Sequence, residues 1–366
     1  MSPVFASLPL VLLGGVLLVG NDACTRSSAS WHDPSHHQVE FVTVEDNVKL
    51  EVLDWGGSGR PIVLLAGSGN TAHVYDDFAE KLTGSYHVYG ITRRGFGASS
   101  HADFGYTDQR LANDILQVLH SLRIVAPVLV GHSMAGAELT TLGSQHSDQL
   151  AGLIYLDALR DPTLDDTENA VIRKKLPAAM LNGPEPSDAD RKSFQAYRDW
   201  QKRTGNTVFP ESELRNCYEA NPDGSMGDYK TAESVFNAIT AGIRKRDYSG
   251  IRVPVLAFVG LPASAGRLMG GNYEPKNKQE RAAMDESFKA IVGYIKRDEK
   301  RLQSAVPGAR VIEMPGADHH LFLSNELDVL RELRRFLEGF PSPKIRTQSG
   351  LLTQYRDYTN NYGRER

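Results

Sequence analysis

The chain has 366 residues, of which 40% are hydrophobic and 23% charged, and its formal net charge is −4. This length can bury the core of one large domain with an insertion, or of two domains. The charge is spread without long blocks of one sign, which argues against nucleic acid as a partner. Only two cysteines occur, so the sequence predicts neither a disulfide framework nor a cysteine-rich metal site.

The first predicted element is an apolar run over residues 3–20, followed by a small and polar stretch. The pattern is typical of a secretory signal or of an N-terminal membrane anchor within residues 1–30, although no Lys or Arg precedes it. Ser27 and Ala29 have the spacing of a signal-peptidase site, and lipidation at Cys24 is the weaker interpretation. We therefore expect a secreted, periplasmic or membrane-anchored protein. A hydrophobic helix packed on the domain is the alternative.

From about residue 38 the chain alternates short apolar strands with amphipathic helices, which is typical of a mostly parallel sheet covered on both faces. The first two strands are predicted to form a hairpin around Asp46 and Asn47. Further strands are predicted at 61–67, 85–91, 126–132, 150–158, 253–260 and 309–314. Apolar spacing predicts helices at 73–82, around 111–122, and at the end of the domain around 329–337.

The alternation stops after about residue 160, where the chain becomes charged and helical in pattern and has no buried-strand run. We predict that residues 161–250 form a helical cap inserted between two parts of a core, 38–160 and 251–340. The last residues, 341–366, are expected to be a polar tail. Aromatic residues of the cap either line an apolar pocket or pack within the cap; they are Tyr197, Trp200, Phe209 and Tyr218.

The segment VLVGHSMAGAEL places a serine where a buried strand meets a helix. A strand that turns at once into a helix holds such a serine on a tight elbow, which requires small neighbours; these are Gly131, Ala135 and Gly136. The elbow would expose Ser133 Oγ at the C-terminal edge of the sheet and aim the N–H of Met134 at a developing oxyanion. The alternative is that Ser133 only caps the helix, but a capping box needs Glu or Gln three residues on, where glycine stands.

On these residues the chain resembles the α/β-hydrolase superfamily, over roughly residues 38–340. The family elbow is Gly-x-Ser-x-Gly, and Ala135 stands here in place of the last glycine. A second family motif, Asp-x-Arg-Gly-x-Gly-x-Ser, is matched by TRRGFGAS, with Thr92 in place of Asp; it shapes a loop. The resemblance implies an α/β-hydrolase fold with a mostly parallel eight-stranded sheet, helices on both faces and an inserted helical cap.

A third family feature is a His-Gly turn after the third strand, which supplies the second oxyanion N–H. The corresponding segment is LLAGSGN, with Ala66 in the histidine's place. The resemblance implies that the N–H of Ser68 is this donor. An ordinary glycine turn is the alternative.

A serine is a poor nucleophile until a base takes its proton, and the usual base is a histidine oriented by a carboxylate. The family order is serine, acid, histidine. The family keeps its histidine after the last strand, which implies His319, two residues after a Gly-Ala pair and seven before the expected start of the last helix. His320, directly beside it, is the alternative.

Most relatives carry the acid after the strand that follows the cap, but residues 257–271 contain no carboxylate. A minority place it one strand earlier, where Asp157 closes a wholly apolar strand. A carboxylate there is costly unless it has a partner, and an imidazolium would be one. The alternative is that Asp157 only caps the entry loop of the cap or binds a nearby backbone N–H. Three other carboxylates rank lower: Asp318, Glu138 and Glu313.

The sequence thus predicts a serine hydrolase that cleaves a carboxylic ester or lactone through Ser133, His319 and Asp157, with no cofactor and no metal. The His-His pairs at 36–37 and 319–320 lack the carboxylate or cysteine spacing of a metal site. Peptidases, amidases and C–C bond hydrolases use the same parts, and a non-catalytic ligand-binding protein on this fold is the alternative from another class. The expected partner is a small ester-like molecule, with membrane attachment through the N-terminal segment left open.

Overall fold

The structure is a computed structural model that describes residues 31–164, 176, 184–205, 207–267 and 273–340. The chain divides into two compact units, Met1–Pro34 and Ser35–Arg366. In the first unit, the described residues 31–34 have no regular secondary structure. The predicted N-terminal apolar run and the predicted C-terminal tail lie outside the described residues. Within the described ranges, no helix is both long enough and apolar enough to cross a membrane.

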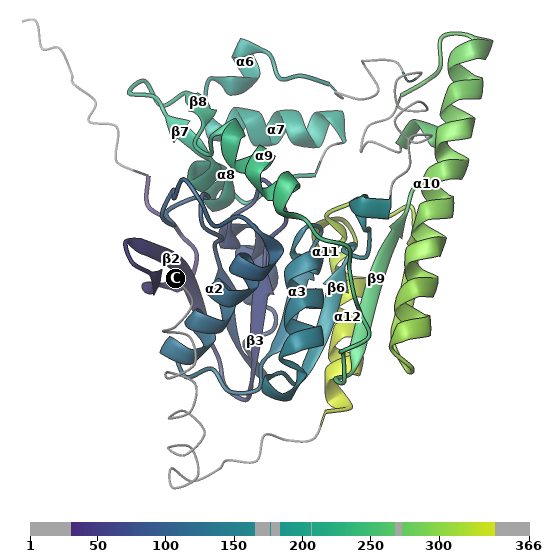
Figure 1. The fold of residues 1–366 in the computed structure, drawn as a ribbon. Helices are drawn as coiled ribbons and strands as arrows, with labels where there is room; N and C mark the ends of the chain where they lie inside the picture. The colour runs from purple at the N-terminus through teal and green to yellow at the C-terminus, as the bar shows by residue number, and fades with distance from the viewer. Residues whose placement is uncertain (1–30, 165–175, 177–183, 206, 268–272, 341–366) are drawn as a thin grey trace, which may run out of the picture. The chain divides into compact units, whose positions relative to one another are not determined.

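The second unit is built on an eight-stranded sheet (Figure 1). In sequence order its strands are β1 (Gln38–Glu45), β2 (Val48–Gly56), β3 (Arg60–Leu65), β4 (Tyr86–Ile91), β5 (Val128–His132), β6 (Gly152–Leu156), β9 (Val255–Leu261) and β10 (Arg310–Pro315). Their order across the sheet is β1-β2-β4-β3-β5-β6-β9-β10. The pairs β1–β2 and β2–β4 are antiparallel and the other five are parallel, so the predicted mostly parallel sheet is confirmed.

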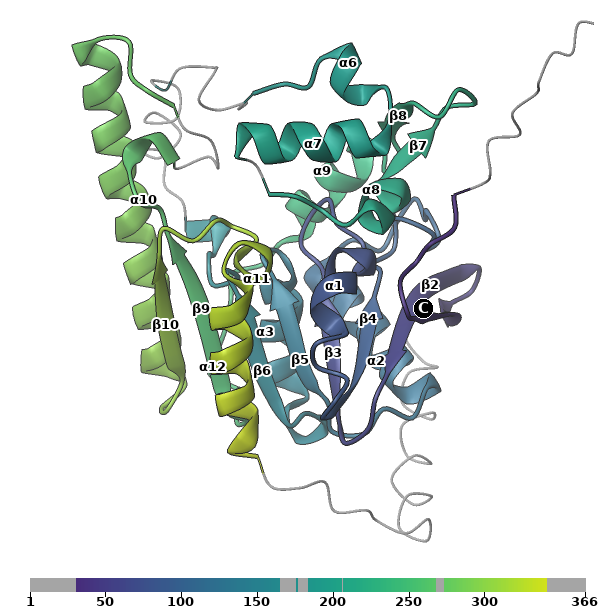
Figure 2. The ribbon, with the colours of Figure 1, turned by 180° about the vertical axis from the view of Figure 1, so that it is seen from behind.

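Helices cover both faces of this sheet. One face carries α2 (Asp108–Ser121), α3 (Ala135–Gln145) and α10 (Lys278–Ala305), which lie in front in Figure 1. The other carries the short 3-10 helix η1 (Ala72–Tyr75), α1 (Asp76–Ala79), α11 (Leu321–Ser324) and α12 (Glu326–Glu338), as Figure 2 shows. The sequence predicted one helix over 73–82, whereas the structure has one turn of 3-10 helix, η1, followed by one turn of α-helix, α1.

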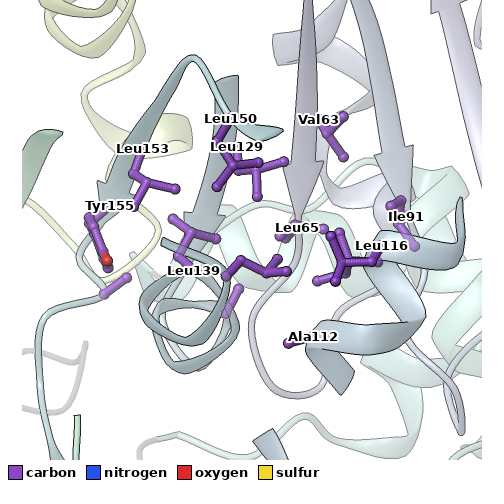
Figure 3. Packing of buried hydrophobic residues seen from close by; sticks show 14 of the residues in the cluster. Val63, Leu65, Ile91, Ala112, Leu116, Leu129, Leu139, Leu150, Leu153 and Tyr155 are labelled. Carbon is purple, nitrogen blue, oxygen red and sulfur yellow. The ribbon is translucent and has the colours of Figure 1, made fainter. Parts of the chain in front are cut away.

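The core forms because successive side chains of a strand point to opposite faces. On β3, Val63 and Leu65 pack with α2 and α3, whereas Ile62 and Leu64 pack with the helices behind the sheet. Figure 3 shows the first of these two clusters, to which both Leu129 of β5 and Leu139 of α3 belong. Burial on both faces explains why these strands read as continuous apolar runs.

The 28-residue helix α10, between β9 and β10, is not predicted by the sequence analysis. Its buried residues include Ser287, Asp298 and Glu299 beside only two apolar side chains, Met284 and Leu302. A helix that buries this few apolar residues has no continuous apolar stripe, which is the signal that sequence analysis relies on.

Between β6 and β9 the chain forms an insertion at the position of the predicted cap, and this insertion is called the cap here. Its elements are η3 (Pro162–Leu164), α6 (Asp188–Arg191), α7 (Phe194–Thr204), α8 (Glu211–Cys217), β7 (Tyr218–Ala220), β8 (Met226–Tyr229) and α9 (Glu233–Gly242) (Figure 1). The antiparallel pair β7–β8 was not expected in a helical cap. It forms around an Asn-Pro-Asp-Gly turn, where the N–H of Gly224 donates to Asn221 O at 2.9 Å and Gly224 has φ +85°.

Candidate active site

Ser133 lies on the sharp turn between β5 and α3, and its φ of +53° is in the left-handed region. The small neighbours make this turn possible. A Cβ on Gly131 would come within 2.6 Å of Leu139 Cδ1, and one on Gly136 within 2.0 Å of the carbonyl oxygen of Ala158. Ser133 N–H donates to the carbonyl oxygen of Leu156 on β6 at 3.1 Å. The strained backbone of the serine is thus held by close packing around the turn.

Three predicted side chains meet at the C-terminal edge of the sheet. Ser133 Oγ lies 2.9 Å from His319 Nε2, and His319 Nδ1 lies 2.6 Å from Asp157 Oδ2. They come from the ends of β5 and β6 and from the loop after β10. The carboxyl ends of parallel strands share one edge of a sheet, so residues 162 and 186 positions apart come into hydrogen-bond contact.

Asp157 is held in place by the neighbouring strand β9. Its φ is +47°, its N–H donates to the carbonyl oxygen of Phe258 at 2.9 Å, and its Oδ1 accepts the N–H of Gly260 at 3.0 Å. One carboxylate oxygen is thus bound to β9 while the other receives Nδ1–H of His319. This arrangement sets the imidazole tautomer that leaves Nε2 free to accept a proton from Ser133.

The other candidates of the sequence analysis have different partners. His320 Nε2 lies 3.1 Å from Asn70 Oδ1. Asp318 lies 3.5 Å from Arg267, Glu313 pairs with Lys296 at 2.5 Å, and Glu138 pairs with Arg93 at 2.6 Å. The structure therefore brings His319 and Asp157 to Ser133, and neither His320 nor any of these three carboxylates joins that hydrogen-bond chain.

Two further imidazoles pack against His319, and sequence reasoning assigned no role to His132. The ring centroid of His132 lies 4.6 Å from that of His319 and 4.6 Å from that of His320. Burial lowers the pKa of His132 well below its usual value, with the neighbouring imidazoles adding to the effect. Burial, followed by the charge of His319, lowers the pKa of His320 to about 3. Both rings are therefore neutral near pH 7 and act as hydrogen-bond donors.

The neutral rings fix the loop that carries His319. Nε2–H of His132 donates to the carbonyl oxygen of His319 at 3.0 Å, and Nε2–H of His320 donates to Asn70 Oδ1. The elbow strand and the loop after β3 thus each hold one residue of the histidine loop. No spacing in the sequence indicates either contact, because each joins segments far apart in the chain.

The loop after β3 passes directly against Ser133. A Cβ on Gly67 would lie 3.0 Å from Ser133 Cβ and 2.7 Å from His132 Nδ1, so only glycine allows this approach. Ser68 follows on this loop and is exposed, while Met134 directly follows Ser133 at the start of α3. The two predicted oxyanion residues therefore lie on the two chain segments that border the serine.

The cap binds the same loop from the other side. Glu213 of α8 is 1% exposed; its Oε1 accepts Asn70 Nδ2–H at 2.8 Å and Thr71 N–H at 3.1 Å. Tyr229 and Cys217 both donate to the carbonyl oxygen of Gly69. The loop is held between core and cap by contacts that the sequence analysis did not foresee.

The structure contains a cavity of about 630 Å³ at this edge of the sheet. Asp157 and His319 line it, together with cap residues and the side chains Ile291, Tyr294 and Ile295 of α10. Of the cap aromatics singled out from the sequence, Tyr197, Trp200 and Phe209 line the cavity. Tyr218 instead packs within the cap. Its ring centroid lies 6.1 Å from that of Tyr197 and 5.0 Å from that of Tyr229.

Comparison with known proteins identifies the family. A sequence model described as "Alpha/beta hydrolase family" matches residues 62–333. The chain belongs to the α/β-hydrolase family. This membership agrees with the sheet order and with the position of Ser133, and it confirms both the resemblance and the fold class expected from the sequence.

Several known proteins are similar to this α/β-hydrolase. A non-heme chloroperoxidase of Burkholderia pyrrocinia is 26% identical over 235 residues, which are 60% of this chain and 81% of that protein. The crystal structure of E-2-(acetamidomethylene)succinate hydrolase has a TM-score of 0.59 at 18% identity and covers 83% of this chain and all of its own. A marine microorganism esterase has a TM-score of 0.54 at 22% identity, covering 79% of this chain and 99% of its own. The two structural likenesses establish the fold alone.

Proposed function

We propose that this α/β-hydrolase is a serine hydrolase that cleaves a carboxylic ester or lactone through an acyl-enzyme intermediate. One observation carries the proposal: the continuous hydrogen-bond chain from Ser133 Oγ through His319 to Asp157, with distances of 2.9 and 2.6 Å. A nucleophile, a base within reach of its proton and a carboxylate that orients the base are the parts that acyl transfer requires.

The proposed reaction follows from these positions. Ser133 Oγ attacks the carbonyl carbon while His319 Nε2 accepts its proton, and Asp157 stabilises the imidazolium that forms. The N–H groups of Met134 and Ser68 donate hydrogen bonds to the carbonyl oxygen and stabilise the negative charge that develops on it. The imidazolium then protonates the leaving alkoxide, and the acyl group remains on Ser133. Water, deprotonated by His319, attacks this acyl-enzyme. The imidazolium returns the proton to Ser133 Oγ as the acyl–oxygen bond breaks, which releases the carboxylic acid and the free serine.

The cavity supports a small acyl or lactone substrate. Tyr197, Trp200 and Phe209 bring three aromatic rings to the cavity that His319 also lines, and charged side chains such as Arg160 and Arg267 line it as well. Apolar walls combined with placed polar groups are typical of small-molecule sites. An ester is the least demanding substrate for such a triad, and one of the structurally similar proteins is an esterase. Amide, peptide and C–C bond cleavage use the same residues and are distinguished by experiment.

A fluorophosphonate probe tests the nucleophile. We expect covalent labelling of the wild-type protein at Ser133, and no labelling of Ser133→Ala, whose hydroxyl is missing. An absence of labelling in the folded wild-type protein would favour a non-catalytic binding protein. A panel of p-nitrophenyl esters of increasing chain length, with lactones and aminoacyl arylamides beside them, then tests the bond type. Turnover of arylamides alone would overturn the ester proposal.

We also propose that the protein is secreted, periplasmic or anchored to a membrane by its N-terminal segment. The support is the apolar run at residues 3–20 followed by small and polar residues. The small-molecule substrate would then be met outside the cytoplasm.

A further inference from the structure

Arg93, in the TRRGFGAS motif, is buried at the point where the loop after β3 meets helix α3. It is 7% exposed, and its partner Glu138, in the first turn of α3, is 3% exposed. Nε donates to Glu138 Oε1 at 2.6 Å and Nη2 donates to Oε2 at 2.9 Å. This two-pronged pairing fixes the plane of the guanidinium relative to α3.

The remaining donors of Arg93 point at the loop. Nη2 donates to the carbonyl oxygen of Ala66 at 3.0 Å, and Nη1 donates to that of Gly67 at 3.4 Å. The C=O and N–H of a trans peptide point in opposite directions. Because the carbonyl of Gly67 faces Arg93, the N–H of Ser68, in the same peptide unit, points away from it. Arg93 thus sets the direction of the second proposed oxyanion donor.

We propose that Arg93 is a positioning residue that keeps the two halves of the oxyanion hole in register. One half is the start of α3, which carries Met134 and is tied to Arg93 through Glu138. The other half is the peptide between Gly67 and Ser68, tied to Arg93 through its carbonyl. The inference rests on the proposed function, since an oxyanion forms only if Ser133 attacks a carbonyl carbon.

This role predicts a particular kinetic signature. Removal of one oxyanion donor costs roughly 10²–10³ in kcat in serine hydrolases, and a misdirected donor costs part of that. We expect Arg93→Met to lower kcat on a p-nitrophenyl ester about 10- to 100-fold while KM changes less than about threefold. The affinity of an aryl trifluoromethyl ketone, which places an oxyanion in the hole, should fall by about the same factor as kcat/KM. Arg93→Lys keeps the charge without the fork and should lie between wild type and Arg93→Met.

Arg93→Met leaves Glu138 as an unpaired buried charge, and this variant could therefore fail to fold. A double variant keeps the test valid in that case, and a matched control accompanies it. Arg93→Met combined with Glu138→Leu removes both charges, and buried ion pairs are often replaced by apolar residues without loss of folding. The double variant should show the same loss of kcat. The matched control is Arg94→Lys: Arg94 is fully buried and pairs with Asp114 of α2 at 2.6 Å. Because its hydrogen bonds reach side chains and a carbonyl outside the loop and α3, kcat should stay within about twofold of wild type.

The outcomes separate this inference from the proposed function. Wild-type labelling by the fluorophosphonate, together with unchanged kcat and ketone affinity in folded Arg93 variants, would overturn the inference alone. An equal loss in Arg94→Lys would also overturn it, because the effect would then be general to buried arginines. Failure of the wild-type protein to label or to turn over esters would contradict the proposed function, and the inference with it.

Discussion

At the scale of single residues, Asp157 joins His319 to the sheet. Its Oδ1 accepts the N–H of Gly260, and its Oδ2 lies 2.6 Å from His319 Nδ1. The first contact prevents the carboxylate from turning, and the second selects the imidazole tautomer that can take a proton at Nε2. Asp157 is only partly buried, with a side-chain exposure of 22%, so its contribution is one of orientation and charge at a site open to the cavity.

Replacement of this carboxylate tests its role. We expect Asp157→Asn to fold and to lower kcat on the best ester by roughly 10²–10⁴, because an amide favours the wrong imidazole tautomer and removes the negative charge. The control is Glu313→Gln, which removes a half-exposed carboxylate paired with Lys296, and it should keep near-wild-type kcat. A comparable kcat in Asp157→Asn and wild type would show that another group orients His319.

His73 makes a pH-dependent contribution to stability. Its Nδ1 lies 3.3 Å from Asp76 Oδ2 and its Nε2 lies 3.4 Å from Glu51 Oε1, all within the buried core. Burial works to lower the pKa of His73, but the two carboxylates outweigh it and raise the pKa to about 10. A raised folded-state pKa gives stability that is fully present below the unfolded value of about 6.5 and is lost as pH rises toward 10.

Urea unfolding of wild type and His73→Gln at pH 6.5, 8 and 10 measures this contribution. We expect the variant to be less stable by roughly 2 kcal/mol at pH 6.5, with the difference shrinking as pH rises. A difference that stays constant over this range would mean that His73 is not charged in the folded protein.

At the scale of elements, helix α8 of the cap contacts the loop after β3 through one buried side chain. Glu213 accepts from Asn70 Nδ2, Thr71 N–H and Thr71 Oγ1, and Asn70 in turn accepts from His320. Burial raises the pKa of Glu213, with the hydrogen bonds from Thr71 and Asn70 opposing the rise. The cap therefore takes part in the polar network that surrounds His319.

Glu213→Ala leaves buried donors without an acceptor, each at a cost of roughly 1–3 kcal/mol. We expect the free energy of unfolding to fall by about 2–4 kcal/mol, with a smaller loss in Glu213→Gln, which keeps one acceptor oxygen. The matched control is Glu211→Ala on the same helix, which removes a partly exposed pair with Arg215 and should change stability by about 1 kcal/mol or less. Equal losses in the Glu213 and Glu211 variants in urea unfolding would argue against a special role for this contact.

At the scale of the whole molecule, the sheet is what assembles the site. Ser133, Asp157 and His319 are carried by the ends of β5 and β6 and by the loop after β10, and this edge of the sheet brings them together. The strands β5 and β6 are neighbours in the sheet (Figure 2). The cap supplies aromatic residues to the cavity beside them. Core and cap thus contribute different parts: the core carries Ser133, Asp157 and His319, and the cap lines part of the cavity.

The N-terminal segment leads to a prediction for the full chain. Expressed with a C-terminal tag in a Gram-negative host, the protein should be found in the periplasmic or membrane fraction, because an apolar run of this kind directs export. Deletion of residues 2–30 should retain it in the cytoplasm. Recovery of the full chain from the cytoplasm would contradict the prediction, and N-terminal sequencing of the exported protein distinguishes cleavage from anchoring.

The strands, the elbow and the fold class could be predicted because they depend on neighbours in the sequence. Burial on both faces makes β3, β5 and β6 visible as apolar runs, and the turn at Ser133 requires small residues at fixed offsets. Helix α10 and the hairpin β7–β8 were not predicted, because they bury few apolar residues and their sequences have no periodic apolar pattern. The role of each site residue stays a prediction until it is tested.

By itself, therefore, the sequence determined the strands of the core, the family resemblance and the place of the serine between a strand and a helix. Only the tertiary structure decided that His319 rather than His320 reaches Ser133, that Asp157 contacts its other nitrogen, and that Arg93 and Glu213 hold the loop between them. The physical reason is distance along the chain. Steric and apolar patterns depend on residues that are close in the sequence. A hydrogen bond between residues 162 or 186 positions apart depends instead on how the sheet and cap have packed.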